Sequence, residues 1–422
     1  MRRWMIVVVL VSCSMAGLPA RAEAGCDAPT AEWTRRSPAE LGFDAAKLQD
    51  ALDWANTHTS ATVKVFRYGC LAAESRLDAL TSDTQFDAWS VTKSVTSMVV
   101  GRAVTLGRFD IDAPIGDLFA EADAAHAALT PRHLLTMSSG LHLNWVRDLN
   151  PFMPDRARDA LSLPFDHEPG TWWAYQQSPV NLLTAALGRA LGEDVQDFAQ
   201  RELFGPLGIP SDAWTWDRDR AGNTEGWAHL HVRSEDLGRL GELILRRGIW
   251  DGTQLISEDY VTQATSPSAA NGSYGLLFWL NTGGHYVMPA VQGHDEGTGK
   301  IIASAPTGTI VMAGNNEQRV HVIPSLDLVV VRMGHNGSFE PDTRKSLWTS
   351  NAGELDYELL RRVQLALTDT AYDDPGPYAG SDPNPPPVDD GVVGDAFDPE
   401  HVLAGAGLGP RAPEGCTPLG CS

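Results

Sequence analysis

A lysine placed inside an apolar helix, one turn after a serine, constrains this sequence more than any other feature. Apolar side chains recur at Val91, Val95 and Val99, which is the spacing of one helix face. Residues three apart on a helix are neighbours, so Ser90 and Lys93 lie within reach of each other. Burial and the positive end of the helix dipole both disfavour an ammonium and lower a lysine pKa. A neutral lysine can accept the proton of a serine hydroxyl, as in the Ser-x-x-Lys arrangement of acylating serine enzymes.

A purely structural interpretation of the same residues also exists. Ser90 would cap the helix, and Lys93 would be an ordinary solvated lysine. The chain has few lysines, and only Lys93 has a serine three positions earlier. It also stands in an otherwise apolar helix, where an ammonium is costly unless it is used. From these residues alone, both interpretations stay open.

The composition limits the partners of this chain. Its 422 residues, 43% of them hydrophobic, are ample for a large core. The formal net charge is −22, which repels polyanions. We therefore expect neither nucleic acid nor an anionic membrane surface as a partner.

Residues 1–24 are predicted to be a signal peptide. Two arginines are followed by a short apolar run and by two small-x-small cleavage sites within residues 20–24. The apolar run is too short to span a bilayer, so no transmembrane segment is expected. Leu10-Val11-Ser12-Cys13 resembles the lipobox of bacterial lipoproteins and would leave a lipid anchor at Cys13. Ordinary secretion is favoured because the two later sites stand at the usual distance.

The cysteines fit export to the periplasm or the exterior. Of the five, Cys13 is removed or lipidated, which leaves an even number for an oxidising compartment. We expect Cys26 to pair with Cys70 and Cys416 with Cys421. Their spacing does not suit a metal site.

Strand-like segments occur near both ends of the chain, and helical segments lie between them. Period-two or β-rich runs predict strands at 62–68, 71–75, 274–280, 309–313, 319–323 and 328–333. Apolar spacing and stop signals predict helices at 45–56, 131–141, 181–191, 194–204, 234–247 and 347–367. We expect one α+β domain over residues 25–371, with a sheet made from both ends and an inserted helical lobe. Residues 372–422 are rich in Pro, Gly and Asp and are predicted to be a mostly irregular tail.

An aromatic loop is the second element with chemical potential. Residues 169–178 form a Gly-containing turn dense in aromatic side chains. Tyr175 could relay a proton between Ser90 and a leaving group, with Lys93 tuning it. A packed tyrosine is the commoner case for a lone Tyr.

Two histidine-containing segments are further candidates for a functional site. Residues 284–308 could hold a metal, shape a cleft or form a polar surface hairpin, and the hairpin is favoured. His229-Leu230-His231 is followed by Arg233, where His-x-His-x-Asp of metallo-hydrolases has its aspartate. Gly-x-Ser-x-Gly, the nucleophile elbow of α/β-hydrolases, is absent from the sequence. We therefore expect neither a metal nor another cofactor.

Several motifs in order resemble one family, the serine β-lactamase and penicillin-recognising superfamily. The likeness is to the branch of class C β-lactamases, esterases and 6-aminohexanoate-dimer hydrolases, and it covers about residues 37–367. It implies an antiparallel sheet flanked by terminal helices, a helical lobe, and an active site between them. The motifs are at residues 89–94, 132–141, 169–171 with Tyr175, 313–319 and 322–331.

The resemblance implies a role for individual residues. Ser90 would be the nucleophile, Lys93 its base partner and Tyr175 the second general acid/base. The backbone N–H groups of Ser90 and Asn315 would form the oxyanion hole. The substrate-binding residues would be Trp172, Gln177, Gly314 and Asn316.

Two departures from the family pattern bear on the substrate. The family's Tyr-x-Asn becomes Tyr175-Gln176-Gln177, so the side-chain amide is placed differently. The strand motif Lys-Thr-Gly corresponds to Gly314-Asn315-Asn316, without a lysine to hold a substrate carboxylate. Glu317 follows and would repel such an anion if it faced the cleft.

The sequence thus predicts an exported serine hydrolase that works through an acyl-enzyme on a small-molecule substrate. Carboxylic esters or linear amides are the favoured substrates. The alternatives are a β-lactamase or D,D-peptidase-like activity, or a non-catalytic cell-envelope binding module with the same fold. The presence of both Ser90 and Lys93 argues against the last.

Overall fold

The computed structural model describes residues 25–28, 32–150, 152–289, 294–334 and 352–380, and two short strands near the end of the chain. The predicted signal peptide lies outside these residues, and so does most of the predicted tail. None of the helices described is both long and apolar enough to cross a bilayer.

The core of the fold is a six-stranded antiparallel sheet in the order β2-β1-β13-β12-β11-β8. β1 pairs directly with β13, so the two ends of the chain meet in the middle of the sheet. The strands are β1 (Ser60–Arg67), β2 (Cys70–Glu74), β8 (Trp279–Asn281), β11 (Thr309–Gly314), β12 (Gln318–Ile323) and β13 (Leu328–Gly334).

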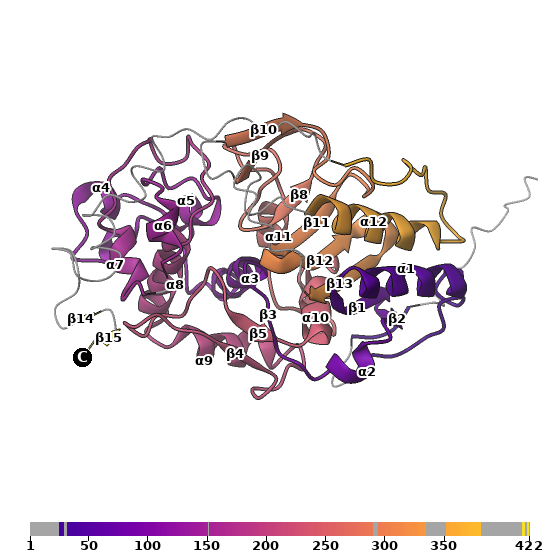
Figure 1. The fold of residues 1–422 in the computed structure, drawn as a ribbon. Coiled ribbons are helices and arrows are strands. Elements are labelled where there is room, and N and C mark those ends of the chain that lie inside the picture. Colours follow the sequence, from indigo (N-terminus) through magenta and orange to yellow (C-terminus); the bar gives the residue numbers. More distant parts are fainter. Residues whose placement is uncertain are drawn as a thin grey trace, which may run out of the picture.

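Helices cover both faces of this sheet, and so β13 is buried along its whole length. α10 (Ser234–Leu245) lies over one face, where Gly238 and Gly241 leave room for Phe66 and Val329. The opposite face meets α12 (Ala352–Leu365), whose Asp356 lies 3.1 Å from His321 of β12. α12 lies beside α1 (Ala45–Thr57) in front of the sheet (Figure 1).

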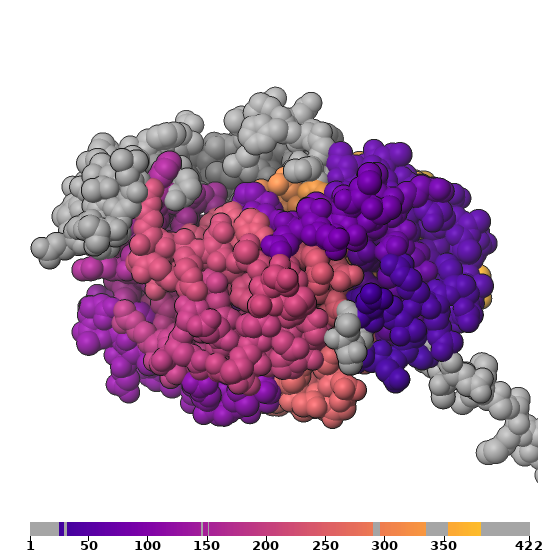
Figure 2. Space-filling view, turned by 90° about the horizontal axis from the view of Figure 1, so that it is seen from below, coloured from indigo at the N-terminus to yellow at the C-terminus, as the bar shows by residue number. Residues whose placement is uncertain are grey.

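A helical lobe is inserted in the chain between β2 and β8 of the central sheet. α3 (Val91–Thr105) runs between this lobe and the sheet and contacts both β11 and α8 (Figure 1). A small sheet in the order β3-β5-β4 joins the two parts, and from below its surface lies between the helical lobe and the N-terminal part (Figure 2). The lobe and small-sheet elements are β3 (Phe86–Asp87), α4 (Ala124–Ala127), α5 (Pro131–Leu135), α6 (Trp145–Asp148), α7 (Arg156–Ala160), α8 (Ser178–Leu191), α9 (Val195–Ala199), β4 (Trp214–Trp216) and β5 (Leu230–Val232).

The remaining elements lie at the edges. The favoured polar hairpin is present as β9 (His285–Pro289) and β10 (His294–Thr298). The others are α2 (Asp78–Thr81), β6 (Ile249–Trp250), β7 (Thr253–Gln254), α11 (Glu258–Ala264), β14 (Cys416–Thr417) and β15 (Gly420–Cys421).

The predicted α+β class, with a sheet from both ends and an inserted lobe, is confirmed. Two predicted elements are shorter than expected. The helix at 131–141 ends at Leu135, and Met137 then has a positive φ of 55°. The strand predicted at 274–280 begins only at Trp279, because Leu277 takes a φ of 62° and breaks the extended run.

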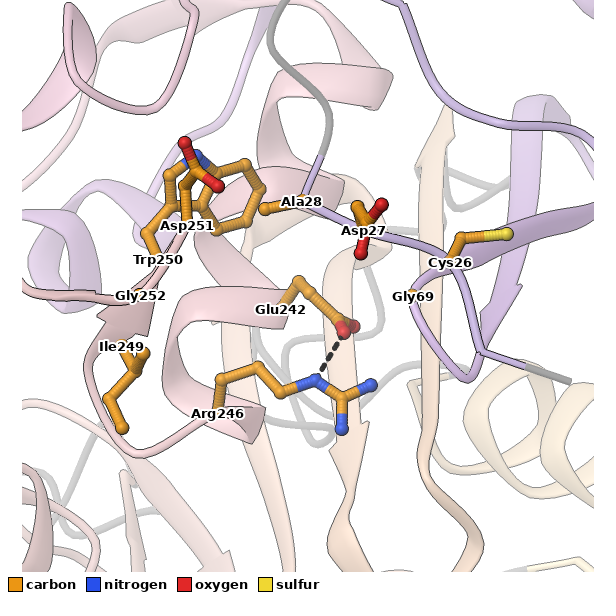
Figure 3. Close-up of a pocket in the computed structure, with 10 residues that line it drawn as sticks. All are labelled: Cys26, Asp27, Ala28, Gly69, Glu242, Arg246, Ile249, Trp250, Asp251 and Gly252. Carbon is orange, nitrogen blue, oxygen red and sulfur yellow. Dashed lines mark hydrogen bonds and ion pairs between the residues drawn. The ribbon is translucent and has the colours of Figure 1, made fainter. Parts of the chain in front are cut away.

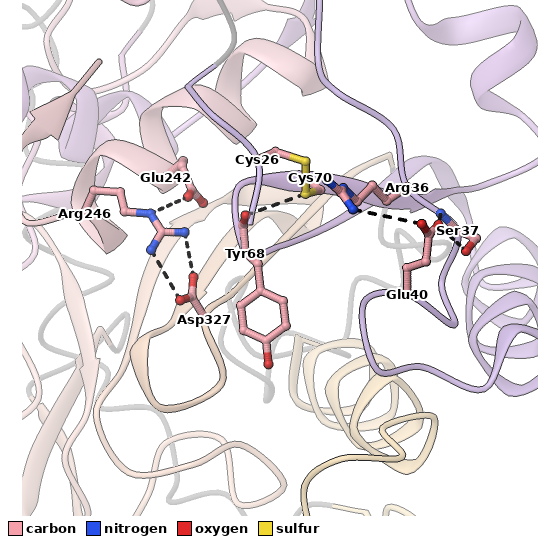
Figure 4. Close-up of a disulfide and its surroundings, with 9 residues drawn as sticks. All are labelled: Cys26, Arg36, Ser37, Glu40, Tyr68, Cys70, Glu242, Arg246 and Asp327. Carbon is pink, nitrogen blue, oxygen red and sulfur yellow. Dashed lines mark hydrogen bonds and ion pairs between the residues drawn. A yellow bond between two sulfur atoms is a disulfide. The ribbon is translucent and has the colours of Figure 1, made fainter. Parts of the chain in front are cut away.

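A disulfide joins Cys26 to Cys70, as predicted (Figure 4). The N–H of Cys26 also donates to the carbonyl of Tyr68 at 2.8 Å, so the N-terminal segment is tied to the β1–β2 turn. Cys416 stands opposite Cys421 in the backbone register of β14 and β15. Their side chains lie outside the described residues, and the second bond stays a prediction.

Replacing both Cys26 and Cys70 by serine is expected to lower the free energy of unfolding by about 2–4 kcal/mol, because the bond closes a long loop in the unfolded chain. The sequence separation is 44 residues. Urea unfolding of the variant and of the wild type, with and without a thiol reductant, measures this. Reduced wild type should match the variant, and equal stability of all samples would contradict the prediction.

Candidate active site

Ser90 directly precedes α3, and its side chain makes no capping bond to the helix. Instead, Ser90 Oγ lies 2.9 Å from the Nζ of Lys93. Lys93 is 1% exposed and Ser90 is 6% exposed. The capped serine and the solvated lysine of the structural interpretation are therefore both absent.

The surroundings of Lys93 favour a neutral amine. Its Nζ donates to the carbonyl of Trp227 at 2.9 Å and lies 4.7 Å from the centre of the Tyr175 ring. Burial lowers the pKa of Lys93 well below its usual value; the charge of Asp148 opposes this shift and that of Arg156 adds to it. Both hydrogen-bonding partners are neutral oxygens, so no adjacent carboxylate holds the proton on the amine.

Asp148 instead fixes the start of α8. Its two carboxylate oxygens accept the backbone N–H groups of Gln177 at 2.7 Å and of Ser178 at 2.9 Å. The N-terminus of a helix has unpaired N–H groups and positive partial charge, which suit a buried carboxylate. Because Tyr175 lies just before these residues, Asp148 also positions the aromatic loop.

Tyr175 reaches the serine from this loop. Its ring packs among Trp173, Tyr274 and Trp279, with centroids 5.9–6.3 Å away. Burial raises the pKa of Tyr175, opposed by its hydrogen bond with Ser90 and by the charge of Arg319. The phenol therefore keeps its proton at neutral pH.

The end of β11 lies in backbone contact with the serine turn. A Cβ at Gly314 would lie 2.4 Å from the carbonyl oxygen of Ala88 and 3.0 Å from the nitrogen of Ser90. Only glycine fits at that distance. The structure thus brings Gly314 to Ser90, and Asn315 is the next residue in the chain. Their roles in binding and in the oxyanion hole stay predictions.

The structure corrects the expectation for Glu317. Its side chain is 6% exposed and accepts a hydrogen bond from Arg319 Nη2 at 2.6 Å. Arg319 also donates to Asp356 at 2.8 Å and to the carbonyl of Gly314 at 2.7 Å. Burial raises the pKa of Glu317 to about 7, and Arg319 favours its charged form. Glu317 thus supports the strand from behind and is held by Arg319, so it does not supply the expected repulsion.

The remaining predicted substrate contacts differ in their exposure. Trp172 is 37% exposed and its ring stacks on His167, so it remains a candidate. Gln177 is fully buried, and neither atom of its amide has a hydrogen-bond partner in the described part of the chain. The Gln177 amide is enclosed in this structure, and its role as a substrate contact stays a prediction. Asn316 is half-buried, and its carbonyl accepts a bond from Arg332 at 2.7 Å.

Two residues that contact the candidate site had not been predicted from the sequence. Trp227 lies 134 residues after Lys93 and binds it through a backbone carbonyl, which no residue type reveals. Strand alternation could not reveal Arg319 as a partner of Glu317, because Glu317 lies in the turn before β12 with a φ of 61°.

A separate cavity of about 340 Å³ lies beside the disulfide and the end of α10 (Figure 3). Glu242 and Arg246 face each other there at 2.8 Å. None of its lining residues is Ser90, Lys93 or Tyr175. Within the described ranges, no cluster of three His, Cys, Asp or Glu side chains suits a metal ion.

Comparisons with known sequences agree with this geometry. The model of the Beta-lactamase family matches residues 52–350, well over half of the chain. An uncharacterised protein of Alkalihalophilus pseudofirmus is 22% identical over 298 residues, which cover 65% of this chain and 81% of that protein.

Solved structures show the same fold. A protein assigned as a 6-aminohexanoate-dimer hydrolase, from Bacillus anthracis, gives a TM-score of 0.57 at 13% identity, over 76% of this chain and 86% of that one. A class C β-lactamase from Rhodobacter sphaeroides gives 0.52 at 19% identity, over 75% and 99%. A β-lactamase/D-alanine carboxypeptidase from Pseudomonas syringae gives 0.53 at 15% identity, over 75% and 97%. The predicted resemblance is confirmed at the level of fold and family.

The lowered pKa of Lys93 predicts a pH-dependent difference between the wild type and Lys93→Met. Between that lowered pKa and the ordinary lysine value of 10.5, the unfolded chain holds a proton that the folded chain has released. Stability then rises with pH, by up to about 1.4 kcal/mol per pH unit. The stability of the wild type relative to Lys93→Met should therefore increase from neutral pH towards pH 10.5. Urea unfolding of both proteins across this range measures the difference, and parallel curves would show that folded Lys93 keeps its proton.

Proposed function

The chain belongs to the β-lactamase family of serine hydrolases, and we propose that it is an exported hydrolase that cleaves carboxylic esters or linear amides through an acyl-enzyme. The observation that carries this proposal is the buried amine of Lys93 at 2.9 Å from Ser90 Oγ. An unpaired lysine in an apolar helix is costly unless the neutral amine is used. This also argues against the alternative of a non-catalytic cell-envelope binding module.

In the proposed reaction, Ser90 Oγ attacks the substrate carbonyl while Lys93 Nζ accepts the hydroxyl proton. The backbone N–H groups of Ser90 and Asn315 stabilise the oxyanion of the tetrahedral intermediate. Tyr175 then donates its proton to the departing alkoxide or amine, and the acyl group remains on Ser90. A water molecule attacks the acyl-enzyme with the same groups in reverse roles, which releases the acid and restores the serine.

The substrate preference follows from the charges beside the serine. Arg319, the cation behind Gly314, is paired with Glu317 and Asp356 and is 7% exposed. It is therefore not placed to hold a substrate carboxylate, as the lysine of Lys-Thr-Gly would. Neutral esters and linear amides fit such a site better than β-lactams or D-alanine peptides. The likeness to a protein assigned as a hydrolase of a linear amide supports this choice.

Export rests on two features. The N-terminal sequence has the pattern of a signal peptide, with a possible lipid anchor at Cys13. The disulfide between Cys26 and Cys70 suits an oxidising compartment. We place the enzyme in the periplasm or outside the cell.

Ser90→Ala is expected to lose covalent labelling and turnover while keeping the fold, because Ser90 makes no capping bond. Lys93→Arg should be nearly as inactive, since a guanidinium stays protonated at any working pH. Intact mass after treatment with a fluorophosphonate tests the first point, and kcat/KM for 4-nitrophenyl esters, amino-acid amides and nitrocefin tests the second.

The wild type should prefer an ester or an amide to nitrocefin. Full activity in Ser90→Ala refutes the mechanism, and a wide preference for nitrocefin restores the β-lactamase alternative.

Tyr175→Phe should distinguish substrates by their leaving groups. An amine must be protonated as it leaves, and general acid catalysis contributes about 10²–10⁴-fold to such steps. A nitrophenolate leaves without a proton. We therefore expect a loss of at least about 10²-fold for amides and a much smaller loss for 4-nitrophenyl esters. Equal losses of activity for amides and for 4-nitrophenyl esters would show that Tyr175 does not act as the general acid.

A further inference from the structure

The residue before the nucleophile has a strained backbone. Trp89 has a φ of 48°, in the left-handed region that large side chains rarely occupy. Such a conformation is strained and persists only where the surroundings enforce it. Because Ser90 follows directly, the conformation of Trp89 decides where the serine hydroxyl points.

One carboxylate enforces this conformation. Asp87 Oδ1 accepts the backbone N–H of Trp89 at 2.8 Å. The N–H of Ala88 is held as well, because it donates to the carbonyl of Leu230 at 2.9 Å. The serine turn is thus fixed on both sides of Ala88.

His229 in turn holds the carboxylate. Its Nδ1 lies 2.9 Å from Asp87 Oδ2, and its ring lies against Trp89 and Trp227, with centroids 5.2 Å and 5.1 Å away. His229 itself has a φ of 63°, so a second strained residue faces the first. Neither side chain is fully buried, with exposures of 24% for His229 and 23% for Asp87.

The loop that carries His229 also reaches the base. Trp227, two residues earlier, accepts the bond from Lys93 Nζ at 2.9 Å. Leu230, one residue later, donates its N–H to Thr92 at 3.2 Å. A shift of His229 would therefore displace the serine and the lysine together.

We infer that Asp87 and His229 form a positioning pair, in which the carboxylate holds Trp89 in its left-handed conformation and the imidazole holds the carboxylate, so that Ser90 Oγ meets Lys93. The effect of this pair on catalysis rests on the proposed function. Burial opposes a charged imidazole, but the hydrogen bond to Asp87 and the charges of Asp87, Glu225 and Asp217 outweigh it and raise the pKa of His229.

The test uses His229→Leu, which removes the donor, and His229→Asn, whose amide nitrogen can replace Nδ1. His231→Leu is the matched control, because His231 lies two residues later, on β5, and its side chain meets Asp217 at 3.4 Å. The rate of labelling by a small fluorophosphonate reports on Ser90 without any substrate contacts. Hydrogen exchange of the peptide containing residues 86–92 reports on the turn without any activity.

We expect His229→Leu to lose on the order of 10²-fold in labelling rate and in kcat, with little change in KM, because a small displacement of reacting groups has that effect. His229→Asn should recover most of this loss, and His231→Leu should match the wild type. The amide of Trp89 should exchange faster in His229→Leu only.

Several results would overturn the inference. Labelling of His229→Leu at the wild-type rate would do so, and a raised KM with normal labelling would show that His229 binds substrate instead. If His229→Leu does not fold, Asp87→Ala takes its place, because alanine removes the acceptor of the Trp89 N–H, and wild-type labelling in that variant has the same meaning. A wild type that does not label would refute the proposed function, and the exchange of residues 86–92 would still decide whether the pair holds the turn.

Discussion

The site depends on the burial of one amine among neutral oxygens. Lys93 is enclosed, and its Nζ contacts the Ser90 hydroxyl and the Trp227 carbonyl. In water such an amine would carry a proton and could not act as a base. Removal of solvent shifts that balance without any metal or acidic partner, because a charged ammonium loses its hydration. The aromatic rings of Tyr175 and Trp227 complete the enclosure at 4.7 and 5.4 Å from Nζ.

Rigid surroundings are needed to keep this amine on the serine. The serine turn is held by Asp87, the aromatic loop by Asp148, and the end of β11 by Arg319. Each of these supports is a charged side chain that binds a backbone group. Such bonds are stronger than neutral ones and fix direction as well as distance. The apolar core accounts for the stability of the fold, and these polar bonds fix the turn, the loop and the strand end beside the serine.

The sequence was informative wherever the signal was local. The valine spacing and Ser-x-x-Lys predicted α3, which is however buried on nearly all sides and not along one face, and the β-rich runs predicted the central strands. The carbonyl of Trp227 could not be predicted, because every residue has one and the contact spans 134 positions. Glu317 was expected to repel an anion if it faced the cleft, but its direction could not be predicted, because Asn316 and Glu317 both have positive φ angles that interrupt the strand alternation. Gln177 was placed at the substrate by the resemblance to the family's Tyr-x-Asn, and that role stays a prediction.

Because β1 pairs with β13, the central sheet is completed only late in the synthesis of the chain. The proposed nucleophile is made early, at residue 90, whereas the strand that touches it ends at Gly314 and β13 ends at Gly334. A nascent chain that has not yet reached these residues has Ser90 and Lys93 but neither the strand beside them nor the completed sheet. Such long-range pairings form late, because the entropy of closing a large loop must be lost before the contacts form. The proposed site is therefore assembled only when nearly the whole domain has been made.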